Sequence, residues 1–286
     1  MESNTIDAGA FRDGQQQQWD KASAAWKKYS DFIDENAKHI SARLVELAGV
    51  TAGSRVLDVA AGYGEPSLTA ARVAGSEGRV VATDISAGML AYGRERAAAE
   101  GLDNIDFLQS DAISLDFPAG SFDAAVSRWG IIFDPDGEGA AARVRSFLEP
   151  GCRMAISSWG PPDRAPFLGV PVGTVMQRLD VPPPPPGTPG PLSRPTPEAI
   201  GGLLEGGGFS GVEVEEAEVS FGFGSAEEFT TFVREIAPPI TAMMADRPQE
   251  VQDETWAAIT AAVAEHAADD GSVEFKNLVL LASGSA

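Results

Sequence analysis

The sequence predicts an α/β fold, in which helices cover both faces of a doubly wound, largely parallel sheet. From residue 55 onward, short runs rich in β-branched residues alternate with helical segments, and this alternation is typical of parallel βαβ units. A turn of small residues, 60–64, follows the first run. Ligands bind where such turns meet the carboxyl edge of a parallel sheet. The 286 residues suffice for a single domain, 1–286, with its own hydrophobic core.

Residues 1–50 are expected to form N-terminal helices that precede the sheet. Trp19, Trp26 and Tyr29 are spaced along a polar stretch, and Gly49 is suited to end the last of these helices. The three aromatic residues fit either a packed helix face or a lid over a ligand, and the sequence leaves both interpretations open.

Residues 51–160 are expected to form the ligand-binding core, with five of the seven predicted strands. Pro66 suits the first turn of one helix, and Ser86 and Gly101 suit the beginning and end of the next. The expected strands are 55–60, 79–84, 105–109, 122–127 and 152–157, and the expected helices are 66–74, 86–100 and 140–148.

The second half of the chain begins with a Pro-rich segment, residues 161–196, which includes the unbroken run Pro182–Pro186. Proline rings exclude helix interiors and central strands, so we expect a stiff loop. An interdomain linker and an SH3-type ligand are the alternatives. The expected elements that follow are a core helix and strand in 197–223, a helical cap in 224–271 and a final strand in 272–286.

The charge of the chain disfavours several classes of partner. Acidic side chains outnumber basic ones by 42 to 21, which gives a net charge of −21. Such a charge repels phosphate backbones and anionic lipid, so nucleic-acid and membrane-surface binding are not expected. The acidic surface fits either a GC-rich codon bias or a high-salt habitat.

Other compositional features exclude further classes. Cys152 is the single cysteine, so a disulfide framework and a multi-cysteine zinc site are excluded, and no metal site is expected. The first residues lack the pattern of a secretory signal, and no apolar stretch is long enough to span a membrane. We therefore expect a cytoplasmic protein.

The segment Val56–Pro66 carries the most informative motif. Gly62 and Gly64 would allow a ligand to approach the backbone closely. A dinucleotide fingerprint has the pattern Gly-x-Gly-x-x-Gly. Here the third position falls on Ser67 or, in the other register, on Glu65, whose carboxylate would repel a pyrophosphate. NAD(P) is therefore disfavoured.

The pattern Asp58-x-x-x-Gly62-x-Gly64 resembles motif I of class I S-adenosylmethionine (SAM)-dependent methyltransferases, with Ala60 in place of the first glycine. We therefore expect a Rossmann-like sheet of seven strands, with the last strand antiparallel and a helical cap. The resemblance implies SAM as cofactor, with Asp84 accepting both ribose hydroxyls and with Asp111 at the adenine. The SAM-binding residues that it implies are Asp58, Ala60, Gly62, Gly64, Asp84, Ile85, Met89, Asp111, Ala112 and Ser127.

The two acids have simpler interpretations as well. Asp84 and Asp111 each fit a helix N-cap or a turn, so neither alone would indicate a ligand. Three landmarks in register, at the ends of three successive strands, favour SAM.

The segment Ser127–Pro135 would leave the fourth strand beside the transferred methyl group. Together with Ser157–Pro161 it resembles the small-molecule branch related to ubiquinone/menaquinone biosynthesis, known as type 11. No Asp/Asn-Pro-Pro-Tyr motif follows the fourth strand, which disfavours base-nitrogen and Gln-amide acceptors. The resemblance implies methyl transfer by in-line displacement to a small, largely apolar acceptor. The acceptor-site candidates are Trp129, Arg128, Phe133, Tyr29 and His266, together with the apolar residues of the 224–271 cap.

Several alternatives stay open at this point. Trp129 and Phe133 fit a hydrophobic core as well as an acceptor site. A methyltransferase fold also serves cyclases and isomerases, or non-catalytic SAM-binding modules. The apolar stripes of the cap would fit a homo-oligomer interface too.

Overall fold

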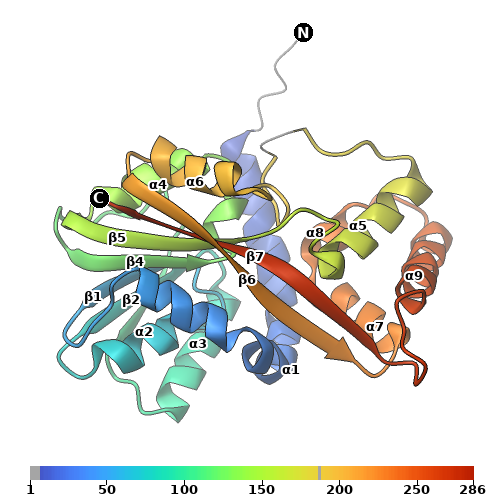
Figure 1. Ribbon diagram of the computed structural model, residues 1–286, viewed down its shortest axis with the longest axis horizontal. Coiled ribbons are helices and arrows are strands. Elements are labelled where there is room, and N and C mark those ends of the chain that lie inside the picture. The colour runs from blue at the N-terminus through green and yellow to red at the C-terminus, as the bar shows by residue number, and fades with distance from the viewer. Residues whose placement is uncertain (1–6, 186–187) are drawn as a thin grey trace, which may run out of the picture.

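The computed structural model describes residues 7–185 and 188–286. Its centre is a seven-stranded sheet of order β3-β2-β1-β4-β5-β7-β6 (Figure 1). The bonded pairs among β1 to β5 are parallel, and β7 is antiparallel to both of its neighbours, β5 and β6. The predicted fold class is therefore confirmed. The strands span Arg55–Val59 (β1), Arg79–Asp84 (β2), Ile105–Gln109 (β3), Phe122–Arg128 (β4), Leu148–Trp159 (β5), Ser210–Phe223 (β6) and Val273–Ser285 (β7).

Helices cover both faces of the sheet. Val56 and Leu57 are neighbours in β1, and they lie in two different hydrophobic clusters because successive strand residues point to opposite faces. Helices α1, α2 and α3 contribute to the first cluster, and α4 and α6 to the second. The helices span Ala8–Leu47 (α1), Ser67–Ala74 (α2), Ala87–Ala99 (α3), Gly137–Arg145 (α4), Pro166–Leu179 (α5), Pro197–Gly206 (α6), Ala226–Ile236 (α7), Pro238–Ala242 (α8) and Gln249–Ala264 (α9), with a 3-10 turn at Ile131–Phe133 (η1).

The N-terminal region forms one continuous helix of 40 residues, α1, where several helices were expected. Asp7 caps its first turn by accepting from the N–H groups of Gly9 and Ala10. Its second half is anchored in the core by Ile40 and Leu44, which are fully buried. Residues 1–6 of the expected helical region lie outside the described residues. In the described part of the chain, no helix combines the length and apolar character that a membrane crossing requires.

A helix, α5, occupies residues 166–179, so the expectation of a loop is wrong for this part of the Pro-rich segment. Pro166 lies at the start of the helix, where its missing N–H has no helical partner to lose. Pro171 lies inside the helix and is buried together with Phe167, Leu168 and Val175. This apolar face offsets the lost backbone bond. The prolines from 182 to 185 are not helical, and Pro186 lies outside the described residues.

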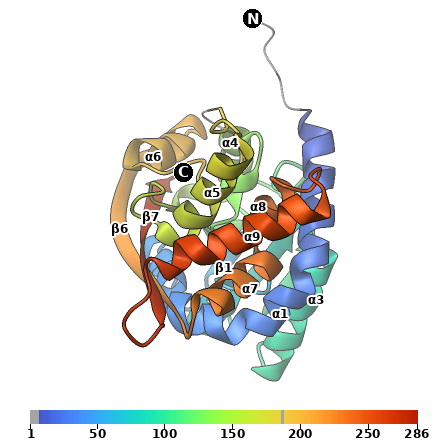
Figure 2. The ribbon, with the colours of Figure 1, turned by 90° about the vertical axis from the view of Figure 1, so that its right-hand side faces the viewer.

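Helices α5, α7, α8 and α9 lie together beside the long antiparallel pair of strands β6 and β7 (Figures 1 and 2). Residues 224–271 thus contain three helices. Phe229 and Phe232 of α7 are fully buried and pack on Phe167 and Phe223. The apolar stripes predicted for this region are therefore core contacts.

Candidate functional site

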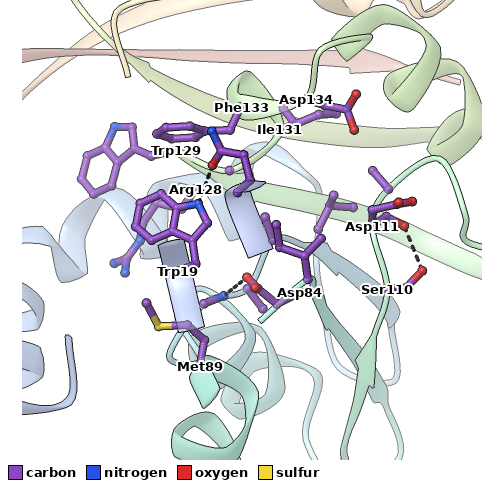
Figure 3. Close-up of a pocket in the computed structure, with 18 of the residues that line it drawn as sticks. Trp19, Asp84, Met89, Ser110, Asp111, Arg128, Trp129, Ile131, Phe133 and Asp134 are labelled. Atoms are coloured by element: carbon purple, nitrogen blue, oxygen red, sulfur yellow. Dashed lines mark hydrogen bonds between the residues drawn. The ribbon is translucent and has the colours of Figure 1, made fainter. Parts of the chain in front are cut away.

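A cavity of about 160 Å³ lies at the carboxyl ends of β1, β2, β3 and β4, under the first half of α1 (Figure 3). The sheet order places β2 and β4 on either side of β1, so the cavity is at the point where the winding of the sheet reverses. The residues that line it are Arg12, Gln15, Trp19, Trp26, Val59, Ala60, Ala61, Gly62, Tyr63, Glu65, Asp84, Ile85, Met89, Ser110, Asp111, Ala112, Arg128, Trp129, Gly130, Ile131, Phe133, Asp134 and Pro135.

The turn after β1 brings bare backbone to the cavity. Gly62 has a positive φ of 54°, and a Cβ atom placed on it would meet no other protein atom within 4 Å. Ala60 also has a positive φ, of 59°, which costs a residue with a Cβ roughly 1–2 kcal/mol. Gly130 leaves room for the Ala60 side chain, because a Cβ on Gly130 would lie 2.5 Å from that of Ala60. The alanine that replaces the motif glycine is thus accommodated by a glycine opposite.

Asp84 ends β2 and holds this turn in place. Its Oδ2 accepts from the Gly62 N–H at 2.8 Å, and its Oδ1 accepts from the Ser86 N–H at 2.8 Å. The N-cap of α3 is Ser86, so Asp84 is not a helix cap. Burial raises the pKa of Asp84 to about 6. A carboxylate offers about four lone-pair positions, so two remain for a ligand.

The other residues expected around the adenine also reach the cavity. Ile85 and Met89 line it beside Asp84, and Asp111 and Ala112 line it after β3. In Figure 3, Asp84 and Met89 lie on a different side of the cavity from Asp111. Asp111 also accepts from the Ser114 N–H at 2.6 Å, so it is a turn acid as well.

Three residues of the expected SAM-binding set do not line the cavity. Asp58 is fully buried and accepts from Ser67 Oγ at 2.5 Å, and burial raises its pKa to about 8. Gly64 packs closely against α3, at Gly93. Ser127 Oγ donates to the Val59 carbonyl at 2.8 Å and accepts from an N–H of η1. These three residues support the turn and η1 from behind.

The segment after β4 forms the opposite wall. Trp129 has a positive φ of 52°, and its backbone N–H donates to Ser157 Oγ at 2.9 Å. Its indole stacks on Trp159, with 4.6 Å between ring centroids and planes within 4° of parallel. Phe133 meets Trp19 edge-to-face at 5.5 Å. Trp129, Phe133 and Asp134 all belong to this wall in Figure 3.

Two acceptor-site candidates lie elsewhere. Tyr29 packs edge-to-face on Phe232 at 4.7 Å, and His266 is an exposed residue beside Phe275. Neither lines the cavity. Among the described residues, none from the 224–271 cap lines it either, so the expectation that the cap forms this pocket is wrong. The cap helices pack against the core instead.

Helix α1 supplies the cavity wall that was expected from the cap. Arg12 pairs with Asp134 at 3.1 Å, and Trp19 Nε1 donates to Gln15 Oε1 at 2.8 Å. Trp26 lines the cavity and donates to the Ile236 carbonyl at 3.0 Å. These four α1 residues are separated by three, four and seven positions, which places them on one helix face. That spacing was the available sequence signal for a lid.

The comparisons with known proteins find similarity to methyltransferases. Residues 56–151 match the model of a family described as a methyltransferase domain. Aklanonic acid methyltransferase DauC of Streptomyces sp. strain C5 is 41% identical over 116 residues, which cover 41% of this chain and 53% of that protein. The UbiE ubiquinone/menaquinone biosynthesis C-methyltransferase of Teredinibacter turnerae is 37% identical over 122 residues, covering 42% and 49%. The chain thus spans about half the length of these curated relatives.

Solved structures extend the likeness of the fold beyond this segment. The [4+2]-cyclase SpnF has a TM-score of 0.61 at 18% identity, and 96% of each chain is covered. A phosphoethanolamine N-methyltransferase 2 of Haemonchus contortus, solved with S-adenosyl-L-methionine, has a TM-score of 0.58 at 20% identity, with 96% of this chain and 60% of that chain covered. At these identities the likeness concerns the fold alone.

Proposed function

We propose that this chain, which carries the class I methyltransferase domain that its motifs indicate, catalyses SAM-dependent methyl transfer to a small, largely apolar molecule. The observation that carries the proposal is the pairing of Asp84 with the open turn at Gly62 on one cavity wall. The names of the two curated relatives, one acting on aklanonic acid and one in ubiquinone/menaquinone biosynthesis, support a small-molecule acceptor.

The residues around the cavity fit SAM in their chemistry. Asp84 has lone pairs left for a vicinal diol, Gly62 leaves space where a side chain would stand, and Ile85 and Met89 offer apolar surface for a flat ring. Asp111 and the backbone of Ala112 would take the polar edge of that ring. When bound, the cofactor supplies a methyl group already activated by a positive sulfonium.

The aromatic wall would orient the acceptor. Trp19, Trp129 and Phe133 give the cavity flat apolar surfaces, and Trp129 is held by its stack on Trp159. In-line displacement requires the two reacting atoms about 3–3.5 Å apart and aligned. The first half of α1 closes over the cavity through the Arg12–Asp134 pair and thereby helps to exclude water.

The acceptor's own acidity matters at this site. Among the described residues that line the cavity, none is a histidine, lysine or cysteine. Of the four carboxylates in this lining, Asp84 and Asp111 accept from backbone N–H groups, Asp134 pairs with Arg12, and Glu65 accepts from Thr69. An acceptor that is ionised at neutral pH needs no protein base, and this chemistry fits the cavity best.

Methyl transfer can be tested without knowing the acceptor. The protein is incubated with SAM that carries an isotope-labelled methyl group and with an organic extract of the cells that produce it. The label should move into the extract only in the presence of the protein, and S-adenosylhomocysteine should accumulate. A molecule in the extract that is transformed without gaining label would favour a cyclase or isomerase instead.

A further inference from the structure

The cavity wall contains a buried cation that has no carboxylate partner. Arg128 ends β4 and is only 7% exposed. It donates to Ser41 Oγ at 2.9 Å and to the Tyr63 hydroxyl at 2.8 Å, both of them neutral groups. Two of the five N–H groups of a guanidinium are used in this way. Within the described residues, no carboxylate lies within 4.0 Å of it.

The carboxylates whose charges act on this guanidinium, Asp34 and Glu65, make their direct contacts with other groups. Asp34 pairs with Arg96 and also accepts from the Tyr63 hydroxyl at 2.7 Å. Glu65 accepts from Thr69 Oγ at 2.7 Å and faces Arg72 at 3.4 Å. The other guanidinium at the cavity, that of Arg12, pairs with Asp134. Arg128 thus has no direct ion pair, since Asp34 and Glu65 act on it only at longer range, and a buried charge without a direct partner is costly.

A second donor stands beside Arg128. The indole Nε1 of Trp129 is buried and has no hydrogen-bond partner within the described part of the chain. The Arg128 guanidinium carbon lies 5.5 Å from the centroid of the Trp129 ring, so the two donors are neighbours at the wall. Trp129 also keeps a left-handed backbone conformation, which is strained for a residue with a Cβ and is enriched at functional sites.

We infer that Arg128 and the indole N–H of Trp129 form a carboxylate subsite in the cavity. A ligand carboxylate would supply the direct ion pair that Arg128 lacks and would accept hydrogen bonds from both donors. This inference rests on the proposed function, because both sources of the carboxylate are ligands of that function. The carboxylate would belong either to the amino-acid end of the cofactor or to an acidic group of the acceptor. The second source fits a cavity that favours an already ionised acceptor.

Two matched pairs of ligands distinguish these sources. S-adenosylhomocysteine and 5′-methylthioadenosine share the nucleoside, but the second has no carboxylate. Sodium 2-naphthoate and 2-naphthamide share their shape, but the second has no charge. Each ligand is titrated calorimetrically into the wild-type protein and into Arg128→Gln, Arg128→Lys and Trp129→Phe, with the naphthyl probes added both with and without S-adenosylhomocysteine. Circular dichroism and thermal unfolding confirm that each variant is folded.

In one pair, Arg128→Gln should raise the dissociation constant of the carboxylate-bearing ligand by about tenfold or more, equivalent to about 1.4 kcal/mol. The dissociation constant of its neutral partner should change by less than about twofold. Arg128→Lys should recover part of the loss, because it keeps the charge. Trp129→Phe should change the same ratio by less, since it removes one donor and keeps the aromatic stack. Arg55→Gln is the control, because Arg55 pairs with Asp123 and does not line the cavity. It should leave the ratio of the two dissociation constants within each pair unchanged.

The outcome of each pair is decisive. A changed ratio for the adenosine pair assigns the subsite to the cofactor, and a changed ratio for the naphthyl pair assigns it to the acceptor. The inference is overturned if, in folded Arg128→Gln protein, the ratio of dissociation constants within each pair is unchanged. It is also overturned if 2-naphthoate does not bind and the ratio for the adenosine pair is unchanged. If neither adenosine ligand binds the wild-type protein, the proposed function fails, and the naphthyl pair still tests the subsite.

Discussion

Replacing Asp84 by alanine should weaken SAM binding while the protein stays folded. Its carboxylate uses one lone pair of each oxygen on the Gly62 and Ser86 N–H groups, both at 2.8 Å. The remaining lone pairs are enough for two ribose hydroxyls. Losing the charged acceptor for this diol should cost about 1.5–3 kcal/mol of binding free energy. The dissociation constant should therefore rise by roughly 10- to 150-fold.

Isothermal titration of SAM and of S-adenosylhomocysteine measures this change directly. Thermal unfolding is recorded in parallel, because the substitution also leaves the Gly62 and Ser86 N–H groups without their acceptor. Asp123→Ala is a suitable control, since Asp123 pairs with Arg55 at the start of β4 and does not line the cavity. A folded Asp84→Ala protein that binds SAM as tightly as the wild type would refute the role of Asp84.

Three further predictions follow from the same structure. Because the pKa of Asp84 is raised to about 6 and its ionised form is the better acceptor, SAM affinity should fall as the pH decreases through about 6, and Asp84→Asn should show a flat profile by titration at several pH values. Ala60→Gly should raise the free energy of unfolding by up to about 1 kcal/mol, because glycine relieves the positive φ at the cost of a more flexible unfolded chain. Ala61 is a buried neighbour with no positive φ, so Ala61→Gly should lower the free energy of unfolding. Equal effects of the two substitutions in denaturant titrations would contradict the strain at Ala60. The melting temperature should rise between low salt and 1 M NaCl, because the net charge of −21 is then screened over about 3 Å, whereas a flat curve would mean that the acidic charges are too dispersed to repel.

The sheet and the cofactor side of the cavity were predictable because local patterns determine them. Strands at 79–84 and 105–109 lie where the apolar runs predicted them, and Ser86 caps α3 as expected. The turn at Gly62 and the acid at Asp84 follow strands whose parallel pairing brings their carboxyl ends to one edge. A local motif combined with a regular topology is therefore enough to bring these residues together.

The acceptor side depends on packing between distant segments, which a single sequence does not specify. The apolar stripe around Phe229 and Phe232 predicted burial correctly, but the same stripe fits a pocket wall or a core. Tyr29 packs on Phe232, whereas Trp19, ten residues earlier on the same helix, reaches the cavity. The stripe therefore shows which residues are buried and leaves their partners undetermined.

Helix α5 was missed for a different reason. Prolines oppose helix formation locally, and the density of prolines in 161–196 predicted a loop. In the structure, Pro166 stands at the one end of a helix that tolerates it, and the burial of Phe167 and Val175 outweighs the local penalty of Pro171. Tertiary packing overrides propensity here.

The central claim is that the cavity transfers a methyl group to a bound acceptor, and product stoichiometry tests it most directly. Once an acceptor has been found in a labelled extract, the purified protein is incubated with that molecule and SAM, and S-adenosylhomocysteine and product are quantified together by mass spectrometry. We expect equal amounts of S-adenosylhomocysteine and methylated product at every time point, with both reduced in Asp84→Ala at low SAM concentration. Consumption of the acceptor without a matching amount of S-adenosylhomocysteine would contradict it.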